Sequence, residues 1–185
     1  MLVRISDPGA LDAAYALRDK AVLGSYDFVE SWLASGRAVA VEESGLHFDQ
    51  EQCHRFSRAF KRSGAEHLLA VSAEAPSDFG RVAYHLDSSP EDLYQCDFEW
   101  QSLNVVLLAG DGPDLAVLCT IADFLLIGGP ASFVNDVVGD LRAAEAEFRD
   151  YIGRHFEVAR PPLERAAKYF SFSAQTPPSA PTQGE

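Results

Sequence analysis

The sequence predicts an α+β domain in which helices pack on a mostly antiparallel sheet of about five to seven strands, with a long helix after the central strands. Three apolar segments, 98–109, 115–121 and 124–127, follow one another closely. Their connections are too short for parallel crossovers, which need about a dozen residues, so they form an antiparallel meander. Apolar residues then repeat at helical spacing over 131–153.

Two helices are expected in the first part of the chain. Asp7 is a capping residue and Pro8 has the fixed φ of a first helical turn, so a helix begins here and continues to about Lys20. Apolar spacing predicts a second, shorter helix at 27–35, which Gly36 ends.

A hairpin and a capped helix come next. Residues 37–43 alternate as a strand does, and a turn at 44–45 leads into a second strand at 46–48. Asp49 then caps a helix that continues to Arg62, with a glutamine at the capping-box position three residues on.

The rest of the chain supplies the sheet, the long helix and a tail. The predicted elements are strands at 66–72 and 81–86, a short helix beginning at Pro90, the meander, a turn at 128–130, the long helix at 131–153 and a last helix at 163–170. Residues 173–185 are too polar and proline-rich to order themselves. We therefore expect a single globular domain at 1–172 and a disordered tail.

Charge is the most informative feature of the sequence. The net charge is −13, and the segment from Val82 to Leu141 holds no Lys or Arg but ten acids. Such a field repels nucleic acid and anionic membranes and attracts a basic protein. The residues we expect to bind that partner are Asp87, Glu91, Asp92, Asp97, Glu99, Asp111 and Asp114. A solvated face that only maintains solubility is the alternative interpretation of the same charge.

Catalytic, cofactor and metal motifs are not found in the sequence. It contains no G-x-S-x-G elbow, P-loop, G-x-G-x-x-G fingerprint or H-E-x-x-H pair. We therefore expect no catalytic residue, no cofactor and no metal. Asp97 and Glu99 would share one face of a strand and suit acid and base chemistry, but acids are frequent throughout this segment.

The location is expected to be the cytoplasm. The three cysteines, Cys53, Cys96 and Cys119, are an odd number without C-x-x-C spacing, which favours a reducing compartment over a disulfide framework. Charged residues appear early at the N-terminus, and no apolar run reaches the roughly 20 residues of a membrane span.

The opening of the chain resembles that of GCN5-type N-acetyltransferases. The resemblance rests on Val3-Arg4-Ile5, on the helix containing Leu11 and Leu17, and on the stretch 36–42. The acetyl-CoA loop of that family, an Arg or Gln followed by x-x-G-x-G or x-x-G-x-A, does not occur downstream. No functional residue is carried over.

These observations favour a non-enzymatic, acidic binding protein that neutralises a basic partner, as an immunity protein or antitoxin does. Two alternatives stay open. One is a small enzyme, such as a degenerate acetyltransferase-like protein. The other is a structural or regulatory subunit whose contact surface would be formed by Trp32, Tyr94, Phe98 and Trp100, although aromatic residues of this kind more often belong to a core.

Overall fold

The computed structural model of the chain describes residues 1–44, 48–73, 81–100, 104–110, 112–120, 122, 124–154 and 160–170. Its centre is a seven-stranded sheet in the order β1-β6-β5-β7-β8-β9-β4, in which every neighbouring pair is antiparallel. The strands in that order are Val3–Arg4, Ala83–Asp87, His67–Ser72, Val105–Ala109, Leu115–Cys119, Phe124–Gly129 and Ala38–Glu43. The α+β class and the antiparallel meander, β7-β8-β9, are confirmed.

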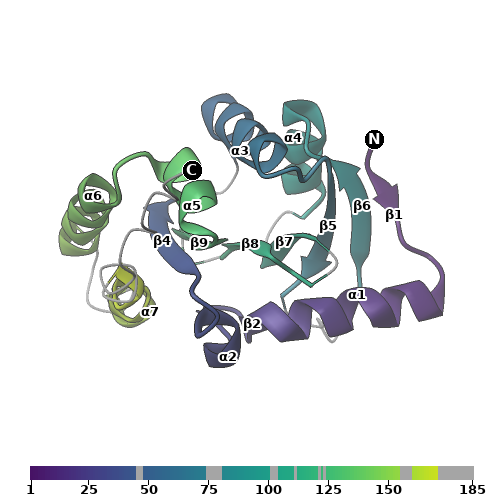
Figure 1. Cartoon of the computed structure of the whole chain (residues 1–185), viewed down its shortest axis with the longest axis horizontal. Coiled ribbons are helices and arrows are strands. Elements are labelled where there is room, and N and C mark those ends of the chain that lie inside the picture. Colours follow the sequence, from purple (N-terminus) through teal and green to yellow (C-terminus); the bar gives the residue numbers. More distant parts are fainter. Residues whose placement is uncertain are drawn as a thin grey trace, which may run out of the picture.

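Helices cover both faces of this sheet (Figure 1). On one face lie α3 (Gln50–Arg62), α4 (Pro90–Glu99) and α5 (Ala131–Val138). On the other lie α1 (Pro8–Ala21) and α2 (Glu30–Leu33), joined by a small hairpin of β2 (Val22–Leu23) and β3 (Asp27–Phe28). The helix α6 (Leu141–Arg154) packs along β4, and α7 (Arg160–Ala167) packs against α6.

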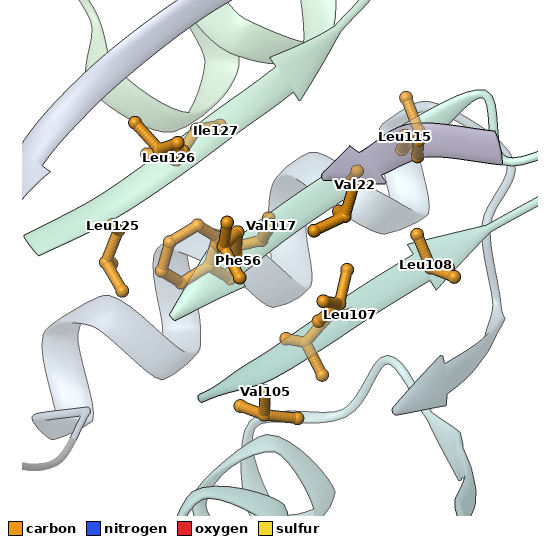
Figure 2. Packing of buried hydrophobic residues seen from close by; sticks show 14 of the residues in the cluster. Val22, Phe56, Val105, Leu107, Leu108, Leu115, Val117, Leu125, Leu126 and Ile127 are labelled. Carbon is orange, nitrogen blue, oxygen red and sulfur yellow. The ribbon is translucent and has the colours of Figure 1, made fainter. Parts of the chain in front are cut away.

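The core explains why the meander has so few polar residues. Strands β7 and β9 are buried at every position because helices lie above and below them. Figure 2 shows part of the cluster, with Phe56 of α3 and Val22 of β2 among the aliphatic residues of β7 to β9. The described helices include none long and apolar enough to cross a bilayer.

Two expectations near the N-terminus are corrected. The helix expected at 27–35 is only four residues long, because residues 27–28 form β3. The strand at 38–43 does not pair with a following hairpin strand in the described part of the chain. Instead β4 pairs with β9, with Ala40 opposite Ile127, so that an apolar strand finds an apolar partner. Residues 45–47 lie outside the described residues.

The strand expected at 98–109 starts seven residues later, at Val105. Leu93, Cys96 and Trp100 are buried and recur at helical spacing, so α4 continues through Glu99. The expectation that acids at 97 and 99 share a strand face is therefore wrong.

The long helix after the meander is present as α6. The stretch expected to be continuous is divided between α5 and α6 at Gly139, whose φ of 74° is a left-handed conformation that ends a helix. The last helix begins at Arg160, so the two prolines that follow occupy its first turn. The expected tail at 173–185 lies outside the described residues.

Candidate functional site

Helix α4 is positioned by its first turn and by its buried face. Ser89 caps the helix by accepting a hydrogen bond of 3.1 Å from the backbone N–H of Asp92, and Pro90 opens it. Leu93 and Cys96 face the interior. The opposite face of α4 is consequently presented to solvent.

Two aromatic side chains stand on that solvent face. Tyr94 is 53% exposed and Phe98 is 57% exposed, and they are four residues apart, which places them side by side on a helix. Among the described aromatic residues no others are this exposed. Trp32 and Trp100, at 5% and 4%, belong to the core instead. The aromatic group named from the sequence thus divides into two core and two surface residues.

Two carboxylates on α4 accompany these rings. Glu91 and Glu99 are exposed, and the described residues contain no ion pair to either of them. We use the name α4 surface for Glu91, Tyr94, Phe98 and Glu99. It combines apolar rings with negative charge, the composition of a surface that binds a protein.

The other acids of α4 have internal partners. Asp97 is half-buried and accepts a hydrogen bond of 3.0 Å from the backbone N–H of Phe48, which holds the segment leading into α3. Asp92 is buried and accepts from the backbone N–H of Asp87 at 3.0 Å and from the ammonium group of Met1. Both stabilise the fold.

Asp87 belongs to a small exposed cluster at the end of β6. Its carboxylate accepts from the Met1 ammonium group at 2.8 Å and contacts Nδ1 of His67 at 2.9 Å. The hydrogen bond from Met1, followed by that from His67, lowers the pKa of Asp87.

The remaining predicted residues lie elsewhere. Asp114 is in the turn between β7 and β8, and its Oδ1 is 3.4 Å from an Nη of Arg37. In the sheet, β5 lies between β6 and the two strands that this turn joins. Asp111 lies outside the described residues. The structure therefore brings Asp87, Glu91, Asp92, Asp97 and Glu99 together on or beside α4 and does not bring Asp114 to them.

A groove adjoins the α4 surface, between α4 and the first turns of α3. It has a volume of about 310 Å³ and is lined by Gln50, Cys53, His54, Pro90, Glu91 and Tyr94. The Cys53 thiol lies at its base, 2% exposed. Burial, and then the negative charges of Asp97 and Asp49, raises the pKa of Cys53 to about 11, so this thiol is neutral near pH 7.

Larger hollows occur elsewhere, and each contains ion pairs formed within the molecule. One, of about 670 Å³, contains two arginine–aspartate pairs, Arg37 with Asp114 and Arg62 with Asp136. Another, of about 440 Å³ between β4 and α6, contains the ion pair of Arg55 with Glu42. The described residues hold no cluster of three or more metal-ligating side chains.

Sequence reasoning identified the acids of this region, but it named the two exposed rings only as part of an alternative contact surface that also included the two core tryptophans. The signal was available, because the buried residues 93, 96 and 100 predict a helix whose other face carries residues 94 and 98. Assigning residue 98 to a strand prevents this helical pattern from being recognised. The stretches behind the acetyltransferase resemblance lie apart, since β1 and β4 are at opposite edges of the sheet.

Comparisons of the chain with protein-family models, curated proteins and solved structures found no match.

Proposed function

We propose that this protein is a non-enzymatic binding protein that recognises a basic protein partner through the α4 surface. The observation that carries the proposal is the exposure of Tyr94 and Phe98, side by side on α4 and flanked by Glu91 and Glu99. Aromatic side chains of this kind supply much of the affinity of protein interfaces. Exposed carboxylates around them accelerate association with a cationic surface.

The proposed class of partner follows from the negative sign of the charge in this part of the chain. No Lys or Arg occurs between residues 82 and 141, so neither α4 nor the meander carries one. An immunity protein or antitoxin that neutralises a basic toxin is the form of binding protein that suits this arrangement. Nucleic acid, whose phosphates carry the same sign of charge, is disfavoured as a partner. We place the protein in the cytoplasm, where its free cysteines stay reduced.

Site-specific crosslinking tests the proposal. A photoreactive phenylalanine analogue would replace Tyr94 or Phe98 in cells, with position 147 on the exposed face of α6 as the control. We expect positions 94 and 98 to capture the same protein, one with a basic surface, and position 147 not to capture it. Capture of an acidic protein, or equal capture at all three positions, would contradict the proposal.

Charge reversal then tests the role of the acids with the captured partner. The variant Glu91→Lys/Glu99→Lys should slow association by about tenfold or more at low salt. The control, Glu147→Lys/Glu164→Lys, changes the net charge equally but alters exposed residues of α6 and α7. An association rate that falls equally in both variants would show that net charge, and not the α4 surface, attracts the partner.

A structural or regulatory subunit is the second candidate, because the same exposed rings favour a permanent contact. The two candidates differ in their dependence on salt. Binding to a basic partner weakens steeply as ionic strength rises, whereas a permanent interface dominated by apolar burial changes little. Dissociation constants of the captured complex at about 50 mM and about 500 mM salt separate them.

A further inference from the structure

We infer that the groove between α3 and α4 is a binding pocket for an arginine side chain, held by the carboxylate of Glu91 and the ring of Tyr94. That this arginine belongs to a basic protein partner rests on the proposed function. The way this molecule holds its own arginines supports the pocket itself.

Arginines that lie over aromatic rings follow one rule in the described structure. Each guanidinium that lies over a ring in the described residues also pairs with a carboxylate. The sets are Arg18 with Tyr15 and Asp19, Arg37 with Trp32 and Asp114, Arg55 with Phe56 and Glu42, Arg81 with Tyr15 and Asp12, and Arg154 with Tyr151 and Asp150. Ring and carboxylate therefore act together as one receptor for a planar cation.

One of these sets has the same helical geometry as the groove. On α1, Asp12 and Tyr15 are three residues apart, and they hold Arg81 from the loop before β6. The Arg81 guanidinium carbon lies 4.2 Å from the centroid of the Tyr15 ring, while one of its Nη atoms pairs with Asp12. Residues at this spacing share a helix face, so a single guanidinium contacts both.

Glu91 and Tyr94 repeat this arrangement on α4. They have the same order and the same three-residue spacing, acid first and tyrosine second, and both line the groove. In the part of the chain that the structure describes, no arginine or lysine pairs with Glu91 or lies over Tyr94. The receptor is present and a cation from another molecule can occupy it.

The walls of the groove suit the rest of an arginine side chain. Cys53 and Pro90 provide apolar surface for the methylene groups, and the Gln50 amide can accept a hydrogen bond from the guanidinium. A volume of about 310 Å³ is at the lower end of small-ligand sites, which favours one long side chain over a large cofactor. The carboxylates of Asp97 and Asp49, which raise the pKa of Cys53, make the potential at the base negative.

Titration with small probes, followed by amide NMR, tests the pocket directly. The probes are N-acetyl-arginine amide, N-acetyl-lysine amide and N-acetyl-citrulline amide, the last being a neutral analogue of nearly the same shape as arginine. We expect saturable shifts confined to residues 50–54 and 90–95 with the arginine probe, and binding at least about tenfold weaker with citrulline. Lysine should bind more weakly than arginine because it lacks the planar group.

Two variants identify the groups responsible. Glu91→Gln and Tyr94→Leu should each weaken binding of the arginine probe by about fivefold or more, while Glu147→Gln, an exposed residue on α6, leaves it unchanged within about twofold. Circular dichroism confirms that each variant is folded. The proposed pocket would be contradicted if the arginine and citrulline probes bound equally well. It would also be contradicted if both variants bound the arginine probe as tightly as the parent protein does.

Failure of the pocket and failure of the proposed function give different results. If the pocket is wrong and the function right, the arginine probe does not bind, but reversal of Glu91 and Glu99 still slows the captured partner. If the function is wrong and the pocket right, the arginine probe binds, while crosslinking from positions 94 and 98 captures no basic protein.

Discussion

Arg55 of α3 pairs with Glu42 of β4 through both of its terminal nitrogens. One of them, Nη1, lies 2.9 Å from Oε2 of Glu42 and also donates to the backbone carbonyl of Val137 at 2.8 Å. A single side chain thus ties together a helix, an edge strand and the end of α5. Burial, the largest single effect, opposes the charged form of Arg55. The hydrogen bond with Glu42 and the negative charges of Glu42, Glu51 and Asp49 together outweigh it and raise the pKa of Arg55.

Replacing Arg55 by methionine should therefore lower the free energy of unfolding by about 2 kcal/mol, because it leaves Glu42 and a carbonyl without their charged donor. The control is Arg58→Met on the same helix, where the described residues contain no ion pair, and it should change stability by less than about 0.5 kcal/mol. Urea denaturation measures both. Equal losses in the two variants would show that Arg55 contributes only its apolar stem.

Gly128 of β9 lies directly against Trp32. A methyl group at Gly128 would come within 2.8 Å of the Trp32 ring and 2.9 Å of the Phe28 ring. Trp32 is not free to move, because its Nε1 donates to the carbonyl of Pro113 at 2.7 Å and Arg37 stacks on its ring.

We expect Gly128→Ala to destabilise the protein by about 2 kcal/mol through overpacking. The matched substitution is Gly153→Ala in α6, where nothing lies within 4 Å of the added carbon. There alanine should stabilise by about 0.5 kcal/mol, because it is the better helix former. Thermal unfolding of both variants checks the contrast, and a neutral Gly128→Ala would mean that α2 can shift away from the sheet.

Asp140 gives stability a dependence on pH. Its carboxylate caps α6 by accepting from the backbone N–H groups of Ala143 at 3.1 Å and Arg142 at 2.7 Å, and these bonds lower its pKa. The folded pKa is thus below the unfolded value of about 3.9, so the charge stabilises the fold above that value. This contribution disappears as the pH falls through the folded pKa.

The variant Asp140→Asn keeps an acceptor oxygen without the charge. We expect it to melt at a lower temperature than the parent protein at pH 7, with the difference shrinking as the pH falls from about 5 to about 2. Asp140→Ala should lower the melting temperature further than Asp140→Asn, because it removes the capping oxygen itself. A difference that does not change with pH would assign the effect to the cap geometry alone.

The cysteines should be inert in the folded protein. Burial is the main reason that the pKa of Cys53 rises to about 11 and that of Cys96 to about 12. Only a thiolate attacks a disulfide reagent, so both should react at pH 8 at least about 100-fold more slowly than in urea. Reaction with Ellman's reagent, followed in native and unfolded protein, measures this ratio. Rapid reaction of Cys53 or Cys96 in the native protein would indicate local opening of α3 or α4, respectively.

The site shows how far sequence reasoning reaches. The lack of cations between residues 82 and 141 is visible in the sequence, and it directed attention to α4. Which acids remain available was decided by contacts, since Asp92, Asp97 and Asp140 all accept backbone hydrogen bonds. The sequence did not separate Tyr94 and Phe98 from the two tryptophans of the alternative contact surface, because their exposure depends on which face of α4 packs against α3.

The sequence alone determined the elements whose signals are local. Asp7 caps α1, and Asp49 with Gln52 forms the capping box of α3, as their positions predict, because each motif involves neighbours within one turn. The short connections of the meander likewise required antiparallel strands. Tertiary structure decided the pairing of β4 with β9 and the close packing of Gly128 against Trp32. These contacts join residues far apart in the chain, so their energies depend on surfaces that exist only once the domain has folded.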